Sequence, residues 1–305
     1  MIEVAIMIEG QNGLTWERWQ RIATAVEEGG FVGLYRSDHF TNPEPPDIDS
    51  LECWISLAWL ASHTKRIEFG PLVSPVSFRD PVMLARQALA VDDLSGGRLT
   101  FGVGAGWQVR EHANFGYELL DKQRRLARFE ESVEVMSRLL RSDEPVSFEG
   151  QFYRLHEAIL LPRPNRAGGP PLLIGGNGPQ RTLPLAARYA TEWNGVMAPP
   201  ATIAERNRQL DELLRQQGRQ PADLRRSFMT NVVFGRNDAE VTHKLQGRDA
   251  SELQSRGFMV GTADAVVAQI GAYADAGVQR IMLQWLDLDD LDGLAALAQG
   301  VLPQL

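Results

Sequence analysis

A histidine beside an aspartate, at the end of a short apolar run, is the pair in this sequence best suited to moving a proton. Asp38 and His39 follow the run Phe31–Tyr35. An imidazole titrates near neutral pH and is the commonest general acid or base. If the strand continues through the pair, the two side chains point to opposite sides, because successive side chains of a strand alternate. Taken alone, such a histidine also fits a surface or structural role.

A glycine-rich loop is the second chemical feature. Gly175–Gly176–Asn177–Gly178 stands between an apolar run and a helical stretch. Bare N–H groups in such a loop can face an anion, and the N-terminus of the next helix adds partial positive charge. Arg181, expected one turn into that helix, can add a guanidinium contact. We predict a phosphate site here, and the alternative is a tight turn between strand and helix.

The sequence does not favour metal or hydrolase chemistry. His63, His112, His156 and His243 fall on expected helices or inserted segments, and the helical pair H-E-x-x-H does not occur. The serine hydrolase motif G-x-S-x-G is absent as well. Cys53 is the single cysteine, so neither an intrachain disulfide nor a cysteine zinc site can form. We predict no metal site.

Short apolar runs alternate with amphipathic stretches along the whole sequence. Capping signals mark several of the helices, such as Thr15 before one helix, Gly29–Gly30 at its end, and Asp80–Pro81 before another that runs to Leu94. Further helices are expected over Pro179–Tyr189 and, capped by Thr262, over Ala263–Ala276. The expected strands are Glu3–Ile8, Phe31–Tyr35, Ile67–Leu72, Leu99–Val103, Pro171–Gly175, Glu192–Met197, Phe228–Phe234 and Gln279–Trp285.

Eight strand and helix units fit either a (β/α)₈ barrel or two doubly wound domains. No linker interrupts the middle of the chain, and Gly102–Val103–Gly104–Ala105–Gly106 falls short of G-x-G-x-x-G because Trp107 follows. We therefore predict a single barrel domain over residues 1–305 with insertions after strands 4 and 7. The first insertion, roughly Trp107–Asn165, contains an expected hairpin, Val146–Leu155, that turns at Glu149–Gly150.

A barrel enzyme builds its active site where the strands end. Trp107 and Trp193 lie at such positions and can wall a planar ring, although packing in the core is the alternative. The residues expected at strand ends are Glu9, Gln11, Asp38, His39, Ser74, Gly104, Ala105, Gly106, Trp107, Gly175, Gly176, Asn177, Gly178, Trp193, Asn194 and Gln284.

The charge of the chain argues against nucleic acid as a partner. The formal net charge is −8, and no basic tract is present to neutralise a phosphate backbone. No run of eighteen apolar residues suggests a membrane span, and the apolar segment Met1–Ile8 lacks the features of a signal peptide. We expect a cytoplasmic protein that acts on a small molecule.

Several long motifs, in order, resemble the luciferase-like monooxygenase family and its coenzyme F420-dependent oxidoreductases. The motifs are Tyr35–Arg36–Ser37–Asp38–His39–Phe40, Phe69–Gly70–Pro71–Leu72–Val73–Ser74–Pro75, Phe78–Arg79–Asp80–Pro81, Leu94–Ser95–Gly96–Gly97–Arg98–Leu99, Gly102–Val103–Gly104–Ala105–Gly106–Trp107, Glu111–His112, Phe115–Gly116, Leu173–Ile174–Gly175–Gly176–Asn177–Gly178, Ala186–Ala187–Arg188–Tyr189 and Trp193–Asn194.

The resemblance implies a barrel, usually homodimeric, whose cofactor ring lies across the mouth with its phosphate at the loop after strand five. It implies that His39 sits beside the ring and substrate, and that a non-proline cis peptide, which we place at Leu72–Val73, bulges under the ring. The predicted catalytic residues are His39 and Asp38. The predicted cofactor-binding residues are Leu72, Val73, Ser74, Gly104, Ala105, Gly106, Trp107, Gly175, Gly176, Asn177, Gly178, Arg181, Trp193 and Asn194.

The activity implied by the resemblance is hydride transfer between coenzyme F420 and a small organic substrate. Some sugar-phosphate dehydrogenases of this kind carry a catalytic acid where this chain has Trp107, so sugar-phosphate oxidation is disfavoured. Glu111 is the nearest carboxylate, and its role stays open. Two alternatives remain: an FMN-dependent monooxygenase, and a non-catalytic flavin-binding barrel.

Overall fold

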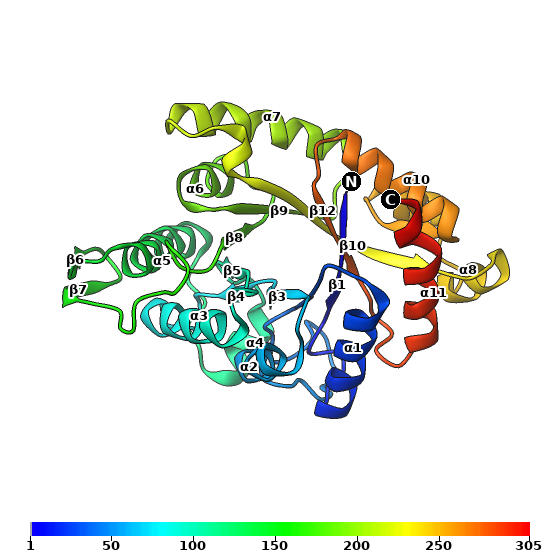
Figure 1. Cartoon of the computed structure of the whole chain (residues 1–305), viewed down its shortest axis with the longest axis horizontal. Helices are drawn as coiled ribbons and strands as arrows, with labels where there is room; N and C mark the ends of the chain where they lie inside the picture. Colours follow the sequence, from blue (N-terminus) through cyan, green and yellow to red (C-terminus); the bar gives the residue numbers. More distant parts are fainter. Residues whose placement is uncertain (1) are drawn as a thin grey trace.

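The computed structural model describes residues 2–305, which form a barrel of parallel strands surrounded by helices (Figure 1). The barrel strands are β1 (Glu3–Ile8), β2 (Gly33–Arg36), β3 (Glu68–Pro71), β4 (Ser74–Pro75), β5 (Phe101–Gly104), β8 (Leu172–Gly175), β9 (Glu192–Val196), β10 (Arg225–Phe234) and β12 (Arg280–Gln284). Their order is β3-β2-β1-β12-β10-β9-β8-β5-β4. A parallel bridge between Phe69 and Leu99 joins the two ends of this order.

One helix returns the chain after each unit of the barrel, with β3 and β4 counting as one interrupted strand. These helices are α1 (Trp16–Gly29), α2 (Cys53–His63), α3 (Pro81–Ser95), α5 (Lys122–Arg141), α6 (Thr182–Tyr189), α7 (Pro200–Gln216), α10 (Ala263–Asp275) and α11 (Leu291–Val301). In Figure 1 they form the outer ring, and α11 packs against α1. The predicted (β/α)₈ barrel is confirmed.

The additional elements fall after β5 and after β10, within the two predicted insertions. They are α4 (Val109–Phe115), the hairpin of β6 (Val146–Glu149) and β7 (Arg154–Ala158), α8 (Asp238–Leu245), α9 (Ala250–Ser255) and β11 (Met259–Gly261). Two 3₁₀ turns lie outside these insertions, at Pro221–Asp223 before β10 and at Leu302–Gln304 after α11. The hairpin turns after Glu149, as predicted, and its second strand runs three residues further than expected, to Ala158. No helix in residues 2–305 has the length and apolar character needed to cross a membrane.

The capping residues explain where most helices begin and end. The Thr15 hydroxyl accepts a hydrogen bond from the N–H of Arg18, and Asp80 accepts from the first turn of α3. Thr262 precedes α10 as predicted, but its side chain makes no capping bond. The start predicted for α6 is wrong: the helix begins at Thr182 rather than near Pro179, so Arg181 precedes it.

Strand alternation divides the apolar residues into two layers. The layer between the sheet and the helices is the larger and contains residues such as Ile6, Phe101 and Trp193. The layer inside the barrel is small and consists of Ala5, Met7, Tyr35, Leu72, Leu173, Met229 and Met282. The barrel is therefore filled, and a ligand can enter only above this inner layer.

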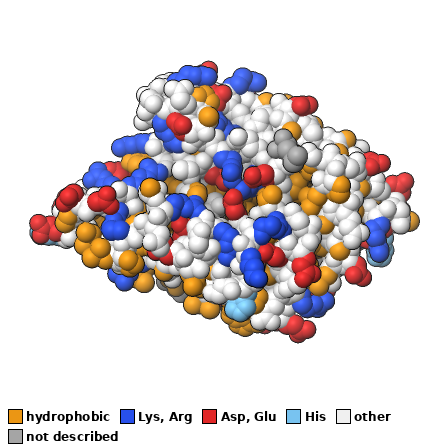
Figure 2. All heavy atoms as spheres, viewed as in Figure 1, with side chains coloured by type: hydrophobic (Ala, Val, Ile, Leu, Met, Phe, Trp, Pro, Cys, Tyr) orange, Lys and Arg blue, Asp and Glu red, His pale blue; other side chains and the backbone are white. Residues whose placement is uncertain are grey.

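The amino end of the barrel is closed by charge pairs. The guanidinium of Arg280 is fully buried and lies 2.8 Å from Glu3, 2.7 Å from Glu68 and 3.4 Å from Glu192. Figure 2 shows acidic and basic side chains gathered over the middle of this face. Burial raises the pKa of Glu192 above its usual range, and the opposing charge of Arg280 offsets only part of that effect. The opposite, carboxyl end of the strands forms the open mouth.

Candidate functional site

The floor of the mouth is a bulge between β3 and β4. A cis peptide joins Leu72 to Val73, at the bond predicted from the family resemblance. A Cβ atom at Gly104 would lie 2.5 Å from the Val73 side chain, and one at Gly175 would lie 3.4 Å from it. Glycines on β5 and β8 therefore leave the space that Val73 occupies at the top of the barrel.

His39 is held from one side by a buried carboxylate. Its Nδ1 atom lies 3.0 Å and 3.1 Å from the two oxygens of Glu111, which is 1% exposed at the start of α4. Burial alone would lower the pKa of His39, but the hydrogen bond and charge of Glu111 outweigh it and the pKa is raised. The role of Glu111 could not be predicted from the sequence, because the contact joins residues 72 positions apart.

Asp38 makes no hydrogen bond to His39, and β2 ends before this pair, so strand alternation does not reach it. The Asp38 carboxylate accepts hydrogen bonds from the Ser74 hydroxyl at 2.7 Å and from the Arg79 guanidinium at 2.6 and 2.7 Å. The Ser74 hydroxyl also accepts from the indole of Trp54. Asp38 and Ser74 are buried. The Ser74 hydroxyl is thus engaged in this network, and the assignment of Ser74 to the cofactor site stays a prediction.

Trp107 presents an exposed aromatic ring beside His39. The two rings are 5.8 Å apart in an edge-on arrangement, and Trp107 is 59% exposed. Gly106 has φ +80°, and a side chain there would clash with Ser77, so glycine is required for the turn that precedes Trp107. Ala105 packs partly against the core. This geometry fits the predicted role of Trp107 as one wall of a ring site.

The glycine loop after β8 is fixed by its neighbours on β9. The Asn177 side chain donates to the carbonyl of Val196 at 2.6 Å and accepts from the Val196 N–H at 3.0 Å. Gly176 has φ +121°, and its N–H donates to the carbonyl of Asn194. Within residues 2–305, the N–H groups of Asn177 and Gly178 have no hydrogen-bond partner. Two backbone donors are therefore free to meet an anion.

The side chains of three residues predicted to bind the cofactor are engaged with other parts of the protein. Trp193 is fully buried toward the helices, where its N–H bonds the Gly176 carbonyl, so its ring cannot wall a pocket. The Asn194 side chain lies inside the barrel and bonds Ser227. Arg181 lies 2.5 Å from Glu130 on the surface, so its guanidinium is engaged outside the loop.

Glu9 adds a third acidic group at the mouth, beside Glu111 and Asp38. Its carboxylate accepts from the side-chain amides of Gln11, at 2.7 Å, and Gln284. Residues 2–305 contain no group of three His, Cys, Asp or Glu side chains arranged to hold a metal ion. These carboxylates are thus hydrogen-bonded individually.

A cleft of about 1150 Å³ lies at the ends of β10 and β12 against α8. Phe234, Phe258 and Trp285 contribute apolar surface. Lys244 pairs with Asp290 at 2.6 Å, so one of the cationic side chains of the cleft is already neutralised. Asn231, which lines the cleft, stands opposite Gln284 in the sheet. The cleft therefore adjoins the mouth and has room for a substrate.

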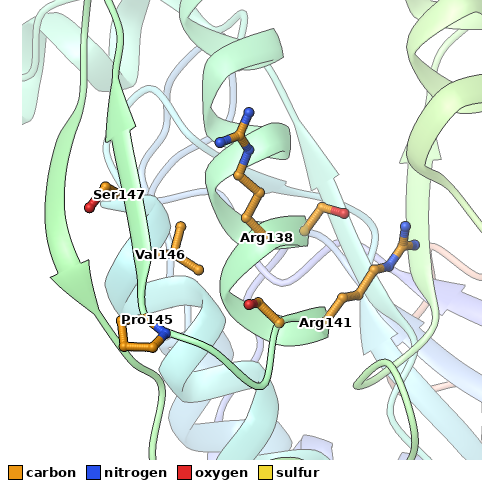
Figure 3. Close-up of a pocket in the computed structure, with 7 residues that line it drawn as sticks. Arg138, Arg141, Pro145, Val146 and Ser147 are labelled. Atoms are coloured by element: carbon orange, nitrogen blue, oxygen red, sulfur yellow. The ribbon is translucent and has the colours of Figure 1, made fainter.

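A second pocket, of about 530 Å³, lies between α5 and the hairpin, away from the mouth (Figure 3). The Arg138 and Arg141 side chains extend away from Pro145 in this view. Arg138 pairs with Glu134, and Arg141 donates to the carbonyl of Tyr189 at the end of α6. Both cations are thus occupied in supporting helices.

The sequence of this chain matches a known protein family whose members share the fold described above. The family described as luciferase-like monooxygenase matches residues 2–258. The chain belongs to this family. The resemblance seen in the sequence is thereby confirmed, and relatives with F420-dependent activities are among the matches.

Two relatives show that proteins similar to this chain have different activities. An F420-dependent glucose-6-phosphate dehydrogenase of Kineococcus radiotolerans is 31% identical over 91% of this chain and 81% of its own length. A 4-hydroxyprotoasukamycin monooxygenase of Streptomyces nodosus is 34% identical over 62% of this chain, and the alignment covers only 49% of that protein.

Solved structures show the same fold. An F420-dependent secondary alcohol dehydrogenase, solved with an F420-acetone adduct, has a TM-score of 0.87 at 21% identity and covers 99% of this chain and 98% of its own. The EDTA monooxygenase of Chelativorans sp. BNC1 has a TM-score of 0.81 at 17% identity, with 99% and 95% covered.

Proposed function

We propose that this protein is an oxidoreductase that transfers hydride between coenzyme F420 and a small organic substrate. The observation that carries the proposal is the arrangement at the mouth: an imidazole held by a buried carboxylate stands beside an exposed indole, above an apolar floor. The F420-dependent relatives support the choice of cofactor.

The residues present fit a ring cofactor that carries a phosphate. The free N–H groups of Asn177 and Gly178 would hold the phosphate, Val73 would support the ring from below, and Trp107 would flank it. When bound, the deazaflavin supplies the ring carbon that accepts or gives hydride. The protein supplies orientation and an apolar floor that excludes water.

His39 would handle the substrate proton. Its Nδ1 is bonded to Glu111, so Nε2 is the ring nitrogen left for a substrate oxygen. We assign Asp38 a supporting role, because Arg79 and Ser74 hold its carboxylate and it makes no hydrogen bond to His39. The cleft beside α8 would accommodate the rest of the substrate.

An FMN-dependent monooxygenase is the second candidate. Monooxygenases among the relatives and structural neighbours support it: the Streptomyces nodosus enzyme is 34% identical over 62% of this chain, and a Baeyer-Villiger monooxygenase of the same fold was solved in complex with FMN. The two proposals differ in what happens to oxygen: only the second requires oxygen to be consumed in the presence of substrate.

The test is a single-turnover assay with a panel of secondary alcohols and ketones. We expect the visible band of oxidised F420 to fall or rise without oxygen uptake. In His39→Ala the rate should fall about 10²–10⁴-fold, the usual cost of losing a positioned acid or base, while F420 affinity stays near that of the wild type. Oxygen uptake with reduced FMN, and no exchange with F420, would favour the monooxygenase instead.

We also propose a cytoplasmic homodimer. Trp16, Ile55 and Met83, on α1, α2 and α3, are 39%, 61% and 53% exposed, and together they offer apolar surface to a second copy. Sedimentation velocity of the wild type and of Ile55→Glu tests this, since the variant should shift the protein toward monomer.

A further inference from the structure

We infer that Glu111 is a positioning residue that keeps the Nδ1 atom of His39 protonated and leaves Nε2 as the proton acceptor at the mouth. The inference rests on the proposed function for its chemical purpose, but the state of the imidazole can be measured without substrate or cofactor. It gives a role to the carboxylate that the sequence left without one.

The hydrogen bonds around Glu111 fix the direction of proton donation. A carboxylate can only accept, and the Nδ1 atom lies 3.0 and 3.1 Å from its two oxygens, so Nδ1 must be the donor. The N–H of Phe40 donates to the same carboxylate at 3.1 Å. In the neutral imidazole the single ring proton then lies on Nδ1, and Nε2 carries the lone pair.

Glu111 is itself held in place from the loop after β2. The Gln108 side chain accepts from the Glu111 N–H at 3.2 Å and donates to the Thr41 carbonyl at 2.7 Å. This couples the start of α4 to the segment that carries His39. A fixed carboxylate on a buried helical turn therefore fixes the orientation of the imidazole plane.

The exposed side of His39 is the side that carries Nε2. Glu111, 1% exposed, covers Nδ1, whereas the imidazole side chain as a whole is 17% exposed. Among residues 2–305, no hydrogen bond involves Nε2. The exposed Trp107 ring stands at the edge of the imidazole. Nε2 is therefore the nitrogen that a substrate hydroxyl can reach.

Three acidic groups face His39, and the neutral ring of Trp107 packs against its edge. Glu111 on α4, Glu9 after β1 and Asp38 beside the imidazole favour the charged form, although Arg79 neutralises Asp38. Burial opposes them, and the pKa of His39 is raised. If an alcohol were the substrate, Nε2 would take its O–H proton as the carbonyl forms, and bound oxidised deazaflavin would supply the hydride acceptor for the C–H electron pair.

The test is nitrogen NMR of protein labelled with ¹⁵N in its histidines. The chain has five histidines, and His39→Gln identifies the His39 signals by their loss. We expect the wild type, above its pKa, to show the Nδ1–H tautomer. In Glu111→Gln the pKa of His39 should fall by about one unit or more, because a neighbouring negative charge is removed.

Glu118→Gln is the matched control, since Glu118 is an exposed carboxylate shortly after α4. It should leave both the tautomer and the pKa of His39 unchanged. The acid limb of the pH profile of kcat/KM should move with the pKa in Glu111→Gln but not in the control.

A wild-type His39 in the Nε2–H tautomer would overturn the inference, even if the Glu111 variants failed to fold. So would an unchanged His39 pKa in a folded Glu111→Gln. Failure of the proposed function looks different: F420 would not bind, while the tautomer of His39 stayed as inferred.

Discussion

The indole N–H of Trp193 lies 2.8 Å from the carbonyl oxygen of Gly176, so a fully buried side chain holds the loop that we propose as the phosphate site. Trp193→Phe removes this hydrogen bond and should cost about 1 kcal/mol, or roughly fivefold in F420 affinity. Fluorescence titration measures the loss. Trp59→Phe, on the outer helix α2, is the control and should bind F420 normally. If both variants bound F420 equally weakly, the hydrogen bond from Trp193 would not be what holds the loop for binding.

Gly176 and Gly218 provide a matched pair of positive-φ glycines, at +121° and +71°. A leucine at either position should destabilise the fold by about 1–2 kcal/mol, because L side chains are strained there. Only Gly176→Leu should also weaken F420 binding, by about tenfold or more, because its side chain would block approach to the backbone. If the folded variant binds as the wild type does, the phosphate site is elsewhere.

Asp38→Asn should affect stability more than cofactor binding. The change leaves the Arg79 guanidinium, whose side chain is 18% exposed, without its charged partner. We expect a loss of about 2 kcal/mol in the free energy of unfolding, measured in urea. Asp47→Asn breaks an exposed pair with Arg110 and should change little. An Asp38→Asn variant as stable as the wild type would contradict the supporting role that we assign to Asp38.

Much of the fold could be predicted because strand alternation and helix caps are local signals. Thr15 and Asp80 mark helix starts through their own side chains. The two-residue β4 and the three-residue β11 were missed because they are too short to show alternation. The predicted start of α6, near Pro179, is too early, because no side chain caps this helix and so no local signal marks its first residue.

The site was predicted less completely, because its contacts join distant parts of the chain. Strand position alone did not show that Trp193 faces the helices while its neighbour Asn194 faces the barrel interior. The bond from His39 to Glu111 depends on how α4 folds back over the mouth, and no local pattern encodes that.

The stability of the protein should depend on pH through His39. Its folded-state pKa is raised above the ordinary value of 6.5, so its stabilising contribution is complete below that value and is lost as pH rises through the folded-state pKa. Urea unfolding of the wild type and His39→Gln, between about pH 5 and pH 9, should show a difference that shrinks as pH rises. A difference that grows with pH would mean that burial outweighs Glu111 and lowers the folded-state pKa of His39.

The most direct measurement is a fluorescence titration of the apoprotein with F420 and, separately, with FMN. The proposed function predicts tight binding of F420, seen as quenching of its fluorescence, weak binding of FMN, and F420 binding weakened by about tenfold or more in Gly176→Leu but not in Gly218→Leu. Micromolar or tighter FMN binding, with no quenching of F420, would contradict the assignment of the cofactor.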